Sequence, residues 1–350
     1  MSNQETSLLS QFIPIVFFGI LTVFFAEVFS GSAPFWFMDA WGVWVVLPLY
    51  WSHALVLFTL ALRSRRTTLT HLYLYGVLFG LYESWVTKVI WAGYMGQEPG
   101  LGTFLGFAVG EFLVIALFWH AIFSFIIPIL MFEIVVASSN RENIIPGHLR
   151  FLKKTKKNQF GYLLAILTGS LFLAAGTSFD LIATLFAAVA NCILVILFMH
   201  ASRSSAEHGL SVETIKLKGT GLGVAILYIL GLYLVMFFIL LPERIPAIET
   251  IILTLAFYAL VFLLIQAKPP EPENDLSKID KEPLLGIADI QQYLLLFVVL
   301  GAFWCLFIGL SDIMGTLLYL GMIVIGPGLF MFSAAMIAAS RLRRRKEQAS

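Results

Sequence analysis

The chain has 350 residues, of which 59% are hydrophobic and only 12% are charged. A soluble domain has about 45–50% apolar and about 25% charged residues, so this composition excludes a soluble globule and indicates a protein embedded in a lipid bilayer. The net charge of +1 gives no sign of a nucleic-acid partner, and only two cysteines, both in apolar stretches, exclude a disulfide framework or a Cys-x-x-Cys metal site.

Apolar stretches of about 20 residues recur along the chain, which is the length a helix needs to cross a hydrocarbon core about 30 Å thick. Because an unpaired backbone amide in lipid costs several kcal/mol, such stretches must be helices. The sequence therefore predicts an all-α, polytopic transmembrane helix bundle with about ten spans. These are residues 11–30, 41–62, 71–94, 103–137, 159–177, 181–200, 221–241, 247–267, 292–310 and 316–339.

The first apolar run is followed by small residues, as a cleaved signal peptide would be. It contains Glu27, and no Lys or Arg precedes it. Both features are unlike a signal peptide, so we expect this run to be the first span.

The basic residues predict the orientation, because loops on the cytoplasmic side are enriched in Lys and Arg. Alternate connections hold nearly all of them, and only Lys88 and Arg244 fall elsewhere. We therefore predict a cell (plasma) membrane protein with both termini cytoplasmic. The basic groups lie at residues 63–66, 141–157, 203–218, 268–281 and 341–346.

Charge and hydropathy also suggest a division of the chain. We predict a four-span N-terminal bundle over 1–137, a basic cytoplasmic loop over 138–158, and a six-span apolar bundle over 159–339. The six-span bundle includes a Pro-rich cytoplasmic linker at 268–291, and a basic tail follows at 340–350. We expect the tail to contact anionic membrane lipids rather than nucleic acid.

Ionisable side chains are concentrated in the first four predicted spans. A charge at mid-bilayer costs about 2.5–3.5 kcal/mol on insertion scales, so such a cluster usually binds or moves something. We take these residues as candidates for binding a small ion or a lipid-like substrate. They are Glu27, His53, Glu83, Lys88, Glu111 and His120.

Helical geometry places some of these residues relative to one another. At 1.5 Å per residue, Glu83, His53 and His120 fall near mid-depth. Glu83 and Thr87 lie four residues apart on one helix face, beside a stripe of small residues, so we expect Glu83 to point into the bundle. Lys88 lies further round that helix, so we expect it to pair with Glu27 or Glu111, or to extend toward the membrane surface.

The fourth predicted span is too long. Its 35 residues would reach roughly 52 Å as one helix, well beyond the hydrocarbon thickness. Pro128 offers a kink, and the glycine-rich start at 102–110 offers a re-entrant segment. In a straight α-helix, Glu111 and His120 would lie on opposite faces because they are nine residues apart.

The first functional hypothesis is a proton- or cation-coupled secondary transporter. In it Glu83 and Glu111 take up and release the ion, and His53 and His120 tune their proton affinity. Against it, the polar residues lie in one half of the chain, whereas carriers commonly build their site from both halves.

The alternative is an intramembrane metal-dependent hydrolase or lipid-modifying enzyme. His53, Glu83 and His120 would hold a divalent metal such as zinc, and Glu83 and Glu111 would be the catalytic carboxylates. No His-Glu-x-x-His spacing supports this hypothesis. A third possibility is a non-catalytic membrane scaffold, in which the polar residues only join helices.

Overall fold

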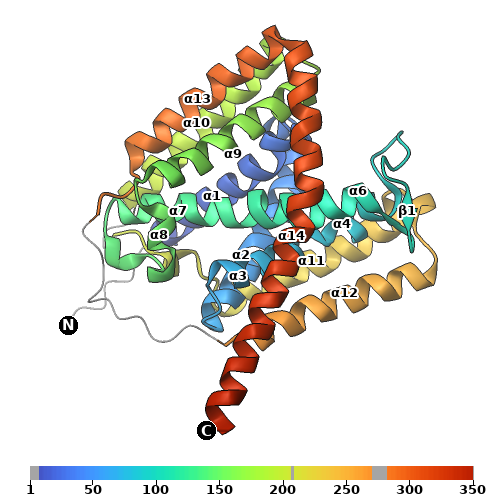
Figure 1. The fold of residues 1–350 in the computed structure, drawn as a ribbon. Coiled ribbons are helices and arrows are strands. Elements are labelled where there is room, and N and C mark those ends of the chain that lie inside the picture. Colours follow the sequence, from blue (N-terminus) through green and yellow to red (C-terminus); the bar gives the residue numbers. More distant parts are fainter. Residues whose placement is uncertain (1–7, 206–208, 270–281, 350) are drawn as a thin grey trace. The chain divides into compact units, whose positions relative to one another are not determined.

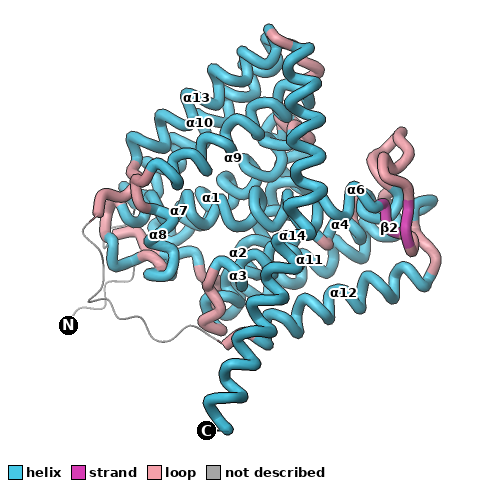
Figure 2. Tube along the Cα trace, viewed as in Figure 1, coloured by secondary structure: helices cyan, strands magenta, loops and turns pink. Residues whose placement is uncertain are grey.

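The computed structural model describes residues 8–205, 209–269 and 282–349. Its regular structure is helical apart from one short hairpin of strands β1 (Thr103–Phe104) and β2 (Phe107–Ala108), as Figures 1 and 2 show. The predicted all-α fold is therefore confirmed. The longer helices are α1 (Leu8–Val23), α2 (Leu47–Arg63), α3 (Leu69–Gly80), α7 (Ile127–Ala137), α9 (Lys156–Gly176), α10 (Leu181–Ser205), α11 (Gly219–Ile239), α12 (Ile248–Ala267), α13 (Ile287–Leu306) and α14 (Ile308–Ala349).

Within the described residues, eight helices are long and apolar enough to cross a membrane. They correspond to eight of the predicted spans, with ends shifted by a few residues. The predicted first span is a shorter apolar helix, Phe12–Val28. The eight are Gly42–Arg63, Val109–Ala137, Lys156–Gly176, Leu181–Ser205, Gly219–Ile239, Ile248–Ala267, Ile287–Leu306 and Ile308–Arg341.

The predicted third span, 71–94, is wrong as a single helix. Helix α3 ends at Gly80, and two single turns follow, α4 (Tyr82–Trp85) and α5 (Val89–Ala92). Lys88 lies between them with a left-handed backbone, φ 57° and ψ 17°. A left-handed residue with a side chain costs roughly 1–2 kcal/mol and cannot continue a right-handed helix.

The fourth predicted span begins later than expected. The glycine-rich start forms the β1–β2 hairpin, whose two-residue turn has φ 51° at Leu105 and φ 79° at Gly106. Positive φ at both positions is the geometry of a tight hairpin turn, so Gly106 serves the turn rather than helix packing. The helix proper starts at Val109, and from Phe112 to Ile126 it is a π-helix, labelled η4.

The chain forms two compact units, and each contains segments from both halves of the sequence. Unit 1 comprises Met1–Leu55, Ile127–Leu217 and Glu273–Leu317, and unit 2 comprises Val56–Ile126, Lys218–Pro272 and Leu318–Ser350. This division differs from the predicted four-span and six-span bundles, because helical contacts join segments that are distant in sequence.

In unit 1, α1 packs against α10, and α13 packs against both α9 and α10 (Figure 1). An aromatic cluster fills the space between these helices. Phe29 stacks on Phe297 with ring centroids 4.7 Å apart, and Phe24 meets both rings edge-on. Asn191 of α10 receives a hydrogen bond from the Trp36 indole at 2.9 Å, which joins α10 to the segment after α1.

Unit 2 is built around the contact of α3 with η4, and α12 also packs against α3. Small residues make the close approach possible. A Cβ atom on Gly76 would lie 2.6 Å from the Cα of Ala121, and one on Gly80 would lie 2.8 Å from the Cα of Ala116. The small-residue stripe predicted on the third span is thus the surface against which η4 packs.

Candidate functional site

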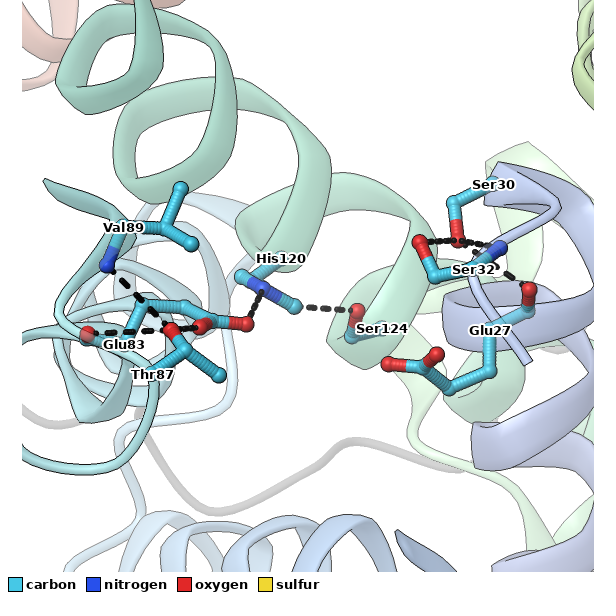
Figure 3. A network of polar contacts seen from close by, with 8 residues as sticks. All are labelled: Glu27, Ser30, Ser32, Glu83, Thr87, Val89, His120 and Ser124. Carbon is cyan, nitrogen blue, oxygen red and sulfur yellow. Dashed lines mark hydrogen bonds and ion pairs between the residues drawn. The ribbon is translucent and has the colours of Figure 1, made fainter. Parts of the chain in front are cut away.

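Glu83 and His120 form a buried acid–base pair in unit 2. His120 Nε2 lies 3.3 Å from Glu83 Oε1 (Figure 3). Glu83 is 8% exposed and His120 is 3% exposed. Glu83 comes from the single turn α4, and His120 comes from η4. Removing an ionised carboxylate from water is costly unless it is paired and hydrogen-bonded, so each group makes the other's burial tolerable.

The interrupted helix supplies Glu83 with a second partner. Thr87 donates its hydroxyl to Glu83 Oε2 and also contacts the Glu83 carbonyl at 3.2 Å. The same hydroxyl accepts the Val89 amide at 3.3 Å (Figure 3). Thr87 therefore links the carboxylate to the restart of the helix at α5.

The π-helix presents His120 between aromatic rings and a hydroxyl. Its imidazole stacks on Phe79 with centroids 5.8 Å apart and meets Tyr82 edge-on at 5.1 Å. His120 Nδ1 lies 2.7 Å from Ser124 Oγ. If the carboxylate is ionised and accepts from Nε2–H, Nδ1 of a neutral imidazole accepts from the serine hydroxyl. The result is a continuous chain of hydrogen bonds from Ser124 through His120 to Glu83.

Lys88 is buried, but its partners differ from those predicted. Its ammonium group donates to the carbonyl oxygens of Met236, at 2.8 Å, and Leu240, at the end of α11. The C-terminus of a helix carries partial negative charge, so it is a favourable place for a cation. The sequence-based pairing with Glu27 or Glu111 is replaced by this backbone contact.

Arg244 makes the reciprocal contact. It follows α11, in the turn η8 (Pro242–Arg244), and its Nη2 donates to the carbonyls of Ala92, Gly93 and Tyr94 at the end of α5. Each of the two segments thus provides a cation for the carbonyl groups that end the other. These hydrogen bonds of Lys88 and Arg244 join the break in the third predicted span to the end of α11.

Glu111 is buried next to the start of η4, at 3% exposure. In the described residues, its Oε2 has no hydrogen-bond partner. The π-helix also changes its relation to His120. Because hydrogen bonds in a π-helix run from i to i+5, each turn takes more residues, and nine residues make about two turns. Glu111 and His120 therefore lie nearer to one face than an α-helix would allow.

The other two predicted site residues, Glu27 and His53, belong to unit 1. Glu27 lies in a π-helical turn, Phe24–Val28, and is partly exposed. His53 is 4% exposed, and its Nδ1 donates to the Leu49 carbonyl of its own helix at 2.7 Å. This bond within one helix fits a structural role for the imidazole.

The predicted metal site is not supported. Within the part of the chain that the structure describes, no group of three or more His, Cys, Asp and Glu side chains is arranged to hold a metal ion. Of the predicted ligands, Glu83 and His120 are in contact within unit 2, and His53 belongs to unit 1. A hydrolytic zinc ion needs three protein ligands and an open position, so this pair alone is one ligand short.

A model described as "Uncharacterized membrane protein family" matches residues 16–344. The chain belongs to this family. It is therefore an integral membrane protein, as the eight apolar helices also indicate. It is similar to an "Uncharacterized protein" of Archaeoglobus fulgidus, with 33% identity over 299 residues that cover 81% of this chain and 87% of the relative. No solved structure matches the chain.

Sequence reasoning missed two features of this family member. Ser124 drew no attention, although its spacing of four residues from His120 could have signalled a contact. A second buried pair was also missed, between Glu133 and His148 in unit 1, with Nδ1 and Oε2 2.6 Å apart. Glu133 lies in α7, and His148 reaches it because the loop after α7 folds back.

Proposed function

We propose that the protein is a proton-coupled secondary transporter of a small or lipid-like substrate, with Glu83 and His120 as its proton-binding pair. With one exchangeable proton bound, the pair is neutral overall. Without it, the pair consists of a carboxylate and a neutral imidazole and carries one negative charge. Loading and unloading a buried pair in this way changes the local charge by one unit. A carrier needs such a change to couple ion movement to substrate movement.

One observation carries this proposal: Glu83 lies where a membrane-length apolar segment is broken into α3, α4 and α5. Secondary transporters commonly build their binding sites from discontinuous helices, because unwound backbone offers polar groups within the membrane. The facing segment η4 is a π-helix, a conformation that is frequent at functional sites. Two irregular helices therefore meet at one buried acid–base pair.

The composition of unit 2 also removes an objection raised by the sequence. Although the charged residues lie in the first third of the chain, unit 2 includes α11 and α12 from the second half. Lys88 binds carbonyl groups of α11, and the Trp85 indole donates to the Tyr258 hydroxyl of α12 at 3.1 Å. The surroundings of Glu83 are thus drawn from both halves, as in known carrier architectures.

A hydrolytic function has one observation in its favour. Ser124, His120 and Glu83 are linked in the order of a nucleophile, a base and an orienting carboxylate. Ser124 is 0% exposed, however, whereas a nucleophile must meet its substrate. A fluorophosphonate probe separates the two functions, since covalent labelling of Ser124 would favour hydrolysis. We expect no label.

The transport proposal is tested with purified protein in liposomes. Vesicles with an imposed pH gradient are incubated with a small-molecule extract of host cells, and the contents are analysed by mass spectrometry. At least one compound should accumulate only while the gradient lasts, and a protonophore should abolish its accumulation. The Glu83→Gln variant keeps the size of the side chain but cannot ionise, so accumulation should fall at least tenfold.

The matched control is Glu249→Gln, which removes an exposed carboxylate at the start of α12. It should transport as well as the wild type. The proposal is overturned if no compound accumulates in response to the gradient, or if Glu83→Gln and Glu249→Gln behave alike.

A further inference from the structure

An open aromatic groove lies in unit 2, and the proposed function has not used it. The groove has a volume of about 480 Å³, within the range of about 300–1,000 Å³ that is typical of small-molecule sites. Its floor is formed by four half-buried aromatic side chains, and exposed Leu and Phe side chains form its rim. The floor residues are Trp85 of α4, Tyr233 and Phe237 of α11, and Tyr258 of α12.

The floor of the groove is connected to Glu83. Trp85 follows Glu83 by two residues in the same turn, α4, and its indole donates to the Tyr258 hydroxyl. Trp85 and Glu83 thus lie in one turn of four residues, and Trp85 itself lines the groove. A ligand in the groove would therefore experience the charge of the Glu83–His120 pair.

The two nearby cations are held by backbone carbonyl groups at helix ends. The Lys88 ammonium group is held by the Met236 and Leu240 carbonyls, and Arg244 is held by the carbonyls that end α5. The end of a helix carries roughly half a negative charge, which offsets part of each cation. When the pair has lost its proton, it carries one negative charge, which a bound cation would offset.

The groove is also suited to a cation by its aromatic rings. The face of an aromatic ring is negative, and aromatic cages bind quaternary ammonium groups through it. Phe237 already receives a cation in this way, since Lys88 Nζ lies 5.7 Å from its ring centroid. Trp85 packs against the rings of both Phe237 and Tyr258, so several ring faces gather at the floor.

We propose that this groove binds a lipophilic, monovalent organic cation, which takes the place of the proton on the Glu83–His120 pair. The inference rests on the proposed function and gives its substrate class. Binding of one cation releases one proton, so the charge of the site is conserved, and the carrier exchanges the two. The rim of Leu and Phe side chains favours an apolar body around the charge.

The test uses two probes of nearly identical shape and opposite charge, the tetraphenylphosphonium cation and the tetraphenylborate anion. Binding to the purified full-length protein is measured by calorimetry in two buffers of different ionisation enthalpy, which counts released protons. We expect the cation to bind at least tenfold more tightly than the anion, with release of about one proton. Glu83→Gln should abolish the proton release.

A matched pair of variants locates the site. Phe237→Leu removes a ring from the floor and should weaken cation binding roughly fivefold, the size of one cation–π contact. Phe262→Leu makes the same change at an exposed position of α12 outside the groove and should have no effect. The comparison of the two probes on the wild-type protein stays decisive even if Phe237→Leu folds poorly.

Equal binding of the two probes, or displacement of the cation by neutral diacyl lipid, would identify a lipid-filled groove and overturn the inference. Equal behaviour of Phe237→Leu and Phe262→Leu would also overturn it. Its failure is distinguishable from failure of the proposed function. Cation binding with proton release but without gradient-driven accumulation would contradict transport, whereas accumulation of other compounds without cation binding would contradict only the groove.

Discussion

Two buried glutamate–histidine pairs occur among the described residues, one in each unit, and their surroundings differ. In unit 1, Glu133 lies in the regular helix α7, its two oxygens bind His148 at 2.6 Å and the Ile145 amide at 2.9 Å, and both side chains are 0% exposed. In unit 2, Glu83 Oε1 and His120 Nε2 are 3.3 Å apart, and both residues lie in irregular helices. Each side chain also contacts a hydroxyl group, Glu83 that of Thr87 and His120 that of Ser124.

The same two side chains therefore serve different purposes. Glu133 binds the loop after α7 at two points, which fixes the loop and leaves the pair no access to a ligand. Glu83 has partners that can reorient, because a hydroxyl group can donate or accept, and an open groove lies nearby. Because their surroundings differ, we expect the Glu133–His148 pair to be structural and the Glu83–His120 pair to be functional.

Among the variants that test this comparison, Glu133→Ala should lower the free energy of unfolding most. Removing one partner of a buried pair leaves the other without compensation, which costs about 3–5 kcal/mol. Chemical unfolding of the purified variant in detergent should show this loss, while the exposed Glu142→Ala on the same loop should stay within about 0.5 kcal/mol of the wild type.

The milder Glu133→Gln variant checks the assignment of roles. Its amide can still bind His148 and its oxygen can still accept the Ile145 amide, so the folded fraction should transport normally. Loss of transport in Glu133→Gln without loss of folding would show that both pairs take part in the function, and the comparison would break down.

Sequence patterns found most of the fold because hydropathy reports directly on membrane-length helices. The predicted span 247–267 corresponds to α12 within one residue, and the predicted span 181–200 starts where α10 starts but ends five residues earlier. The interruption at Lys88 was not predictable in this way. Its left-handed backbone carries no glycine or proline signal, and it depends on carbonyl groups of α11 that lie about 150 residues later.

The candidate site was predicted in part for a related reason. The spacing of Glu83 and Thr87 and the small-residue stripe through Gly80 pointed to one helix face, because these are local relations. The partnership with His120 required the packing of α3 on η4. The groove could not be predicted at all, because Tyr233 and Tyr258 resemble any aromatic residues that face lipid until α11 and α12 are placed together.

A second test moves the working pair apart without touching either residue. In Gly80→Ala the new methyl group would lie 2.8 Å from the Ala116 Cα and 3.1 Å from the His120 Cβ, so η4 must shift away from α3. Overpacking of this kind costs about 1–3 kcal/mol, and we expect a larger proportional loss of transport than of stability.

The control for this variant is Gly231→Ala on α11, where the added methyl group meets no atom within 4 Å. Transport and unfolding should both remain at the wild-type level there. Normal transport by Gly80→Ala would contradict a function that depends on the distance between Glu83 and His120.

The smallest effect is expected from Ser124→Ala, which removes the hydroxyl that contacts His120 Nδ1 at 2.7 Å. One hydrogen bond contributes about 0.5–1.5 kcal/mol, so the variant should fold. Without that contact the imidazole loses the hydroxyl that orients Nδ1, and proton exchange should slow while substrate binding stays unchanged. Pre-steady-state proton uptake, measured with a pH-sensitive dye, separates the two steps.

Ser124→Thr should restore the rate because it keeps the hydroxyl, and Ser138→Ala should leave it unchanged because that hydroxyl binds only the backbone of its own helix, at Val135. If Ser124→Ala and Ser138→Ala exchange protons equally fast, the hydroxyl does not act on the pair. His120 would then resemble His148, an imidazole held in place for packing, and the difference between the two pairs would rest on Glu83 and Thr87 alone.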